Sequence, residues 1–189
     1  MKKLLWAAIA LLCIALAAAF ACSQSAGHGD DTPVVDGEIM AFLSEARALH
    51  HEANLKEDGN DLPGAIAAMD RLVAAKKPHP DRVTPEVEEV LADAYARLAE
   101  LRLKKGDLDA AHDAITTGLA HTPEPTYFKG HLLEVEGLVE EARASKYADA
   151  GNSAEAQKAR ERAIALLEEV VRIQDQVIQR SLAGREAGK

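Results

Sequence analysis

The chain has 189 residues, room for one domain of ordinary size, and 48% of them are hydrophobic, which is enough for a packed core. Aromatic residues make up only 4%, which argues against a β-sandwich or β-barrel, and the formal net charge of −9 argues against nucleic-acid binding. Alanine, leucine, glutamate and arginine dominate the composition, and all four favour helices.

The first residues have the layout of a secretory signal peptide. Lys2 and Lys3 precede an uncharged apolar run over residues 4–21, which ends with the small residues Ala19 and Ala21. These two small residues suit an ordinary signal peptidase. The run is also about as long as a minimal membrane span, so an uncleaved anchor is an alternative.

A small residue directly before Cys22 and the polar Ser23 directly after it resemble the lipobox of bacterial lipoproteins. Ala19 in place of leucine and the bulky Phe20 depart from the usual lipobox. The resemblance implies cleavage after residue 21, acylation of Cys22, and a protein of the bacterial cell envelope that faces the periplasm. The serine after the cysteine favours the outer membrane by resemblance to enterobacterial sorting.

Removal of the signal peptide, residues 1–21, would leave Cys22 as the sole cysteine, so we expect no disulfide and no cysteine-based metal site. Residues 22–36 are small, polar and unpatterned after the cysteine, and we interpret them as the lipidated cysteine with a flexible tether. The helical domain is expected over residues 37–182, with a disordered tail at 183–189.

Six amphipathic helices are predicted from residue 37 onward, because apolar residues recur at spacings of three and four. The breaks fall at glycine or proline, at residues 59–60, 78–80, 106, 122–123 and 151–152. No long segment alternates with the period of two that a half-buried strand requires. Short loops between amphipathic helices indicate antiparallel neighbours, so the predicted fold class is all-α.

The spacing of small and large residues in the middle of the chain resembles the tetratricopeptide repeat (TPR). The matching residues lie within 92–125 and are Gly106, Ala111, Ile115, Gly118 and Pro123. Weaker copies are in register from Ala46 and Gly137, and these registers differ by more than the family's usual period of about 34 residues. The resemblance implies three antiparallel helix pairs stacked as a TPR-like α-solenoid, with a long C-terminal capping helix.

In the TPR family the first helix of each pair contributes the residues that contact a ligand. The positions that correspond in this chain are Arg47, His50, Asn54, Asp93, Ala96, Glu100, Leu138, Glu141 and Ser145. The resemblance therefore implies a partner-binding groove of mixed and rather acidic character. His50 and Leu138 replace the lysines that clamp a C-terminal carboxylate in chaperone-binding relatives, which argues against that activity.

Candidate catalytic and metal-binding patterns are weak. His50 and His51 are adjacent and point about 100° apart on a helix, and Leu55 stands where a zinc-binding HExxH motif needs its second histidine. No nucleophile elbow, P-loop or dinucleotide-binding glycine motif is present in the sequence. We therefore expect no metal, no cofactor and no enzymatic activity.

The last helix carries an unusually broad apolar stripe. Its seam consists of Ala163, Leu166, Val170, Ile173 and Val177, and it is widened by Ile164, Leu167, Val171 and Ile178. Such a stripe either caps the stack or pairs with another chain, as in a homodimer.

These patterns predict a lipid-anchored adaptor that binds a segment of another envelope protein in its groove, with a basic or neutral partner favoured. The alternative is a structural subunit of an envelope assembly that self-associates through the last helix, in which Ile173 and Val177 would form the interface.

Overall fold

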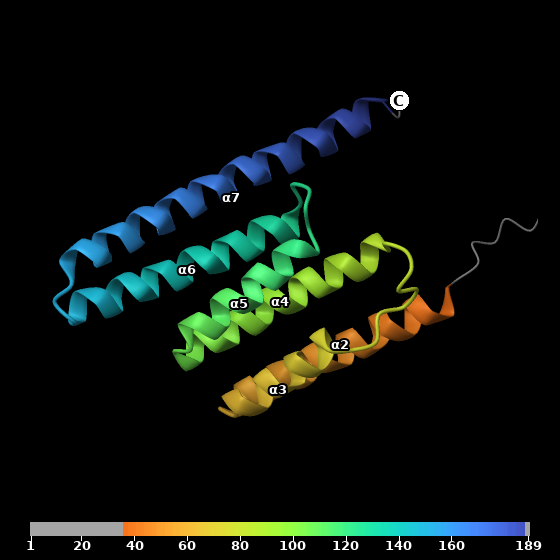
Figure 1. Ribbon diagram of the computed structural model, residues 1–189. Coiled ribbons are helices and arrows are strands. Elements are labelled where there is room, and N and C mark those ends of the chain that lie inside the picture. The colour runs from red at the N-terminus through yellow and green to blue at the C-terminus, as the bar shows by residue number, and fades with distance from the viewer. Residues whose placement is uncertain (1–35, 188–189) are drawn as a thin grey trace, which may run out of the picture. The chain divides into compact units, whose positions relative to one another are not determined.

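The computed structural model describes residues 36–187, which form six helices and, over that range, no strand (Figure 1). The all-α prediction is confirmed. The chain divides into two units, Met1–Asp36 and Gly37–Lys189, and the helices belong to the second. They are α2 (Gly37–Asp58), α3 (Leu62–Val73), α4 (Pro85–Lys105), α5 (Leu108–Ala120), α6 (Tyr127–Asp149) and α7 (Ser153–Ala187).

Consecutive helices pack as the pairs α2–α3, α4–α5 and α6–α7, which confirms the predicted pairing. Helix α4 contacts both α2 and α3, and α6 contacts both α4 and α5. Within the described residues α7 packs on α6 and on no other helix. The first helices α2, α4 and α6 are therefore neighbours in space although they are far apart in sequence (Figure 1).

The turn inside each pair has the same backbone geometry. Asn60, Gly106 and Gly151 occupy equivalent positions and have φ values of 60°, 84° and 76°. A left-handed residue ends the first helix in each pair, and glycine or asparagine adopts that conformation at the lowest cost. Asp61 caps the helix that follows the first of these turns, because its side chain accepts a hydrogen bond from the Gly64 amide at 2.9 Å.

Small residues let the two helices of each pair approach closely. Ala53, Ala99 and Ala144 lie seven residues before the turn residue in the three pairs, and all three are buried. Gly118 on α5 lies against α4 and α6, since a Cβ atom there would come within 2.7 Å of Leu132 and 2.8 Å of Tyr95. The core that these contacts close is mostly alanine and leucine.

Helix α7 divides its apolar residues between two faces, which corrects the predicted dimer surface. Ala163 and Ile173 are buried, and Ile173 lies near Gly130 of α6. A charge at Ile173 would therefore separate α7 from α6, so Ile173 is not part of a dimer surface. The residues predicted to widen the seam are exposed instead: Ile164, Leu167, Val171 and Ile178.

Two predicted helix ends also differ from the structure. Helix α7 continues to Ala187, well past residue 182, because the residues that follow favour a helix and include no proline. Helix α3 ends at Val73, before the predicted stop at Pro78. Among the described helices, none combines the length and the apolar character needed to cross a membrane.

Candidate functional site

Four of the predicted groove residues come together on one face formed by α2, α4 and α6. His50 Nε2 on α2 lies 3.7 Å from Asp93 Oδ2 on α4. His131 on α6 places Nε2 3.2 Å from Glu100 Oε1 and Nδ1 3.8 Å from Asp93 Oδ1, both on α4. Asn54 joins them through Arg97, which donates to Asn54 Oδ1 at 3.1 Å.

Arg97 is the centre of this arrangement, and the sequence analysis did not identify it. It donates to Glu100 Oε2 at 3.0 Å along α4 and also pairs with Glu57 on α2. Lys104 Nζ lies 2.8 Å from the other oxygen of Glu57. Arg97 and Glu100 are three residues apart on one helix, and this spacing predicts the contact between them. The contacts to Asn54 and Glu57 depend on how α2 lies against α4.

We call the side chains joined across α2, α4 and α6 the polar cluster; they are His50, Asn54, Glu57, Asp93, Arg97, Glu100, Lys104 and His131. Its two histidines differ in charge. The carboxylates of Asp93 and Glu100 raise the pKa of His131 to about 10, despite its partial burial. The protonated imidazole in turn lowers the pKa of both carboxyl groups. Burial lowers the pKa of His50, which outweighs the opposite effect of Asp93. At neutral pH the cluster therefore holds a charged His131 and a neutral His50.

The remaining predicted groove residues lie outside the cluster. Arg47, Glu141 and Ser145 are exposed, and Ser145 Oγ donates to the backbone oxygen of Glu141 at 3.2 Å. Leu138 is exposed, whereas Ala96 is fully buried and cannot contact a ligand, which corrects its assignment. The face thus has an inner set of side chains that bind one another across three helices and an outer set that is free to meet a partner.

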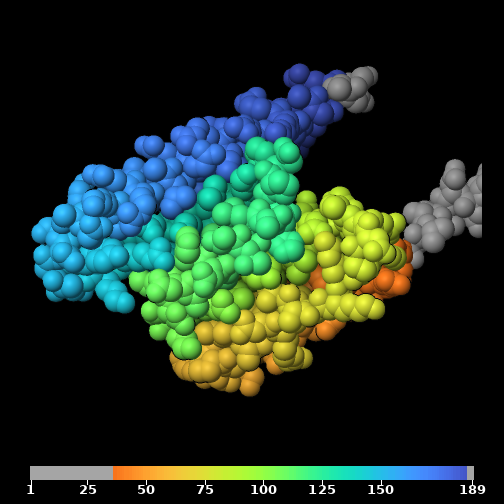
Figure 2. All heavy atoms as spheres, in the orientation of Figure 1, coloured from red at the N-terminus to blue at the C-terminus, as the bar shows by residue number. Residues whose placement is uncertain are grey.

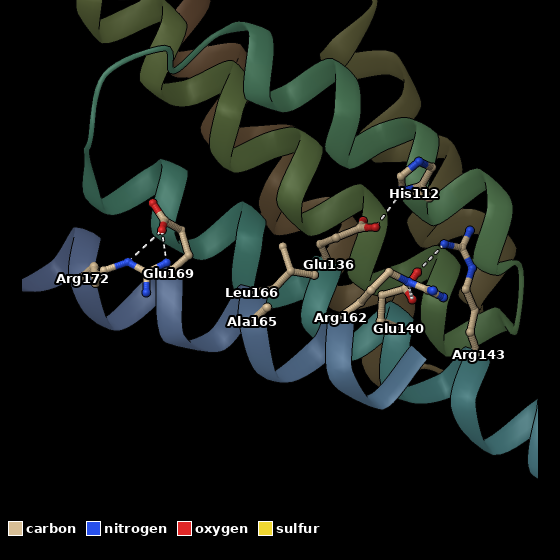
Figure 3. A pocket seen from close by; sticks show the side chains of 9 residues that line it. All are labelled: His112, Glu136, Glu140, Arg143, Arg162, Ala165, Leu166, Glu169 and Arg172. Carbon is tan, nitrogen blue, oxygen red and sulfur yellow. Dashed lines mark hydrogen bonds and ion pairs between the residues drawn. The ribbon is translucent and has the colours of Figure 1, made fainter. Parts of the chain in front are cut away.

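A second polar site lies between α5, α6 and α7, where a cleft of about 630 Å³ opens (Figure 3). Two carboxylates on α6, Glu136 and Glu140, form its wall and are 9% and 4% exposed. His112 on α5 places Nδ1 2.7 Å from Glu136 Oε1. The other oxygen, Glu136 Oε2, is buried and has no hydrogen-bond partner among the described residues.

Glu140 is held by two arginines at the same cleft. Arg143 on α6 donates to Oε1 at 2.7 Å, and Arg162 on α7 donates to Oε2 at 2.6 Å (Figure 3). Burial raises the pKa of the Glu140 carboxyl, but the two bonds to arginine outweigh it, so the pKa is lowered. This carboxylate is therefore ionised at neutral pH and fully paired.

The position of Glu140 along its helix is an indication of this buried charge in the sequence. Glu140 lies eleven residues before Gly151, just as Leu49 and Tyr95 lie eleven residues before the turn residues of the other pairs. Leu49 is buried and Tyr95 packs against the core. A charged residue eleven residues before the turn therefore indicates either that this side of the helix is exposed or that the charge is buried in an ion pair. Glu140 is buried in an ion pair.

Neither site has the arrangement of a metal centre. In the part of the chain that the structure describes, no group of three or more histidine, cysteine, aspartate or glutamate side chains could hold a metal ion. His131, Asp93 and Glu100 are close together, but an imidazole that two carboxylates keep protonated has no nitrogen lone pair with which to bind a metal. Cys22, the predicted lipidation site, lies outside the described residues.

Fold and sites together define an all-α protein of three stacked helix pairs, with a polar face across its first helices and a charged cleft beside its last. No protein-family model, curated protein or solved structure matches the chain.

Proposed function

We propose that this protein is an adaptor whose α2–α4–α6 face binds a segment of another cell-envelope protein. The observation that carries the proposal is the continuity of this face across three helices. The bonds from Arg97 to Asn54 and from His131 to Glu100 place the polar sides of all three helices next to one another. A surface of this length suits an extended or helical segment better than a small molecule.

The outer residues of the face are the ones we assign to partner binding. Arg47, Glu141 and Ser145 are exposed and take part in no ion pair within the described residues, so a partner can approach them without first breaking an internal bond. The inner residues, such as Glu100 and His131, bind each other and keep the three helices in place. This division supports a role in binding, because the inner side chains hold the three helices in place while the outer side chains can adjust to a partner.

The proposal includes a lipid anchor at Cys22 that holds the adaptor at the membrane, as the lipobox resemblance implies. Palmitate labelling of cells expressing the wild-type chain or Cys22→Ala tests this part. Incorporation that the substitution abolishes is the expected result, and equal labelling of both proteins would contradict it.

The binding face is tested by crosslinking and co-purification from the native cell envelope. The variant combines Arg47→Ala, Asn54→Ala and Glu141→Ala, and all three side chains are exposed. Asn54→Ala removes one hydrogen bond from Arg97, but the ion pairs of Glu100 with Arg97 and His131 stay intact. We expect a distinct envelope protein to co-purify with the wild type and to be lost with the variant.

The matched control carries the same kinds of change on the second helices of the pairs. Asp113→Ala on α5 and Gln176→Ala with Arg185→Ala on α7 also remove one acid, one amide and one arginine from exposed positions. The control should retain the partner. Loss of the partner with both variants, or recovery of this chain alone from all three, would contradict the proposal.

A further inference from the structure

The stack of helix pairs is open at the α6–α7 end. Helix α4 covers the α2–α3 pair by contacting both members, and α6 covers the α4–α5 pair in the same way. No helix among the described residues contacts both α6 and α7, and α7 lies along the outside of the stack (Figures 1 and 2). The third pair therefore lacks the covering helix that the first two pairs have.

The surface left uncovered is apolar. Among the described residues, five large apolar side chains on α7 are more than 40% exposed, and their spacing of three, four, seven and four places them on one helix face. We call this face the open-end strip; it consists of Ile164, Leu167, Val171, Ile178 and Leu182. Leu167 also reaches over Gly137 of α6, and the next residue, Leu138, is 43% exposed.

Ion pairs between one helix pair and the helix that covers it follow a consistent polarity. Arg102 and Lys104 of α4 bind Asp70 of α3 and Glu57 of α2 at 2.9 and 2.8 Å. Arg143 of α6 binds Asp109 of α5 at 3.1 Å. The covering helix thus provides the arginine or lysine, and the covered pair provides the carboxylate.

Two contacts that involve histidine have the opposite direction. His50 of α2 lies near Asp93 of α4, and His112 of α5 bonds Glu136 of α6. Neither contact requires a charged base, because a neutral imidazole N–H also donates to a carboxylate. Lys77 also pairs with Glu88 of α4 in this opposite direction, but it lies in the α3–α4 connection and not on a helix. The arginine and lysine pairs that join one helix to another keep one polarity.

The open end carries carboxylates, as the covered pairs do where a covering helix binds them. Glu161, Glu168 and Asp175 are exposed and lie seven residues apart along the outer edge of the open-end strip. Glu168 and Asp175 form no ion pair within the described residues. Glu161 lies ten residues after the turn residue of its pair, in the register where Asp70 binds Arg102.

This acidic edge disfavours a second copy of the chain as the occupant. Two strips packed antiparallel would bring Glu161, Glu168 and Asp175 close to the same residues of the other copy, and like charges across a helix interface repel. Arg160 and Arg185 lie at the two ends of the strip, and Arg172, which lies near its middle beside Glu168, is already paired with Glu169. A partner with lysine or arginine at its edges would be attracted along the whole length.

We propose that the open end of the stack binds an amphipathic helix of another protein, with its apolar side on Val171 and Ile178 and its basic residues facing Glu168 and Asp175. The partner helix would occupy the place that α4 and α6 take on the first two pairs. This inference is independent of the α2–α4–α6 face and stands if that proposal fails.

The probes are two synthetic amphipathic helices with the same leucine seam, one flanked by lysine and the other by glutamate, titrated against the full chain by fluorescence anisotropy. We expect saturable binding of the lysine-flanked helix at least about tenfold tighter than that of its twin. Val171→Asp should weaken this binding about tenfold or more, because it places a carboxylate in the apolar seam. Glu168→Lys should weaken binding of the lysine-flanked helix and strengthen binding of the glutamate-flanked one.

Val83→Asp is the matched control, because Val83 is 78% exposed and lies in the α3–α4 connection, outside α6 and α7. It should leave binding unchanged, and both aspartate variants should melt like the wild type because both valines are exposed. The triple variant of the α2–α4–α6 face should also bind the lysine-flanked helix normally, which separates this test from that of the proposed function.

Three results would overturn the inference. Equal affinity for both helices would show that the acidic edge does not select the partner. A wild-type dimer in sedimentation equilibrium that Val171→Asp converts to monomer would show that the strip pairs with a second copy. A monomer that binds neither helix would show that the strip is a bare surface.

Discussion

His131 on α6 and Glu100 on α4 are joined by a contact of 3.2 Å between Nε2 and Oε1, although 31 residues separate them in the sequence. Asp93, two helical turns before Glu100, lies on the other side of the same imidazole. The two carboxylates keep His131 protonated and thereby connect the second and third helix pairs.

The stability of the protein should depend on pH through His131. Its pKa is raised from the ordinary 6.5 to about 10, so its contribution is complete below pH 6.5 and is lost as the pH rises toward 10. Since the side chain is partly exposed, we expect His131→Gln to lower the free energy of unfolding by about 2 kcal/mol at pH 6. Urea denaturation followed by circular dichroism should show this difference shrinking between pH 7 and 10.

His51→Gln is the control for this prediction, because His51 is exposed on α2 and lies outside the polar cluster. The control should unfold like the wild type at every pH in that interval. If His131→Gln and the wild type lose stability in parallel as the pH rises, His131 is not the responsible group.

Arg97 should couple α4 to α2 energetically. Arg97 and Glu57 are both mostly buried, so we expect Arg97→Gln to destabilise the protein by about 1–2 kcal/mol. A double-mutant cycle with Glu57→Gln should give a coupling energy of about 1 kcal/mol. The same cycle between Glu57 and the exposed Arg47 should be additive, and a coupling of equal size there would assign the effect to the overall charge.

Glu140 should stabilise the α6–α7 pair only while it is ionised. The two bonds to arginine lower its pKa below the ordinary 4.5, so the contribution is present above pH 4.5 and is lost as the pH falls further. We expect Glu140→Gln to cost about 2 kcal/mol at pH 7 and less at pH 3. Thermal melts of the exposed neighbour Glu141→Gln provide the comparison, and equal losses in the two variants would refute a specific role for Glu140.

Gly118 should tolerate no side chain. A Cβ atom at this position would come within 2.7 Å of Leu132 and 2.8 Å of Tyr95, so Gly118→Ala should force α5 away from its neighbours. The expected loss of stability is about 1–3 kcal/mol. Gly184 on α7 has open space around it, so Gly184→Ala should be neutral or slightly stabilising. A stable Gly118→Ala protein would show that the α4–α5 packing is looser than the distances indicate.

The helices and their pairing could be predicted because the relevant information is local. Caps such as Asp61 and turn residues such as Gly106 act within a few residues of the chain, and the spacing of apolar residues is read within a single helix. The same applies to the buried small residues Ala53, Ala99 and Ala144, which recur in a fixed register before each turn.

The candidate site was predicted in part. His50, Asn54, Asp93 and Glu100 were assigned to one groove by the resemblance to the TPR family, and the structure brings them together through Arg97 and His131. Arg97 is one of many charged residues on these helices, and nothing in the spacing of a single helix distinguishes a cross-helix partner from a solvated one.

The sequence by itself therefore determined the six helices and their order, because propensity, capping and periodicity operate over one or two turns. Only the tertiary structure decided which charges meet, how Glu140 is paired in the α5–α6–α7 cleft, and which half of the broad stripe on α7 is covered by α6. These features depend on distances between helices, where a shift of a few ångströms separates a bonded ion pair from two solvated side chains.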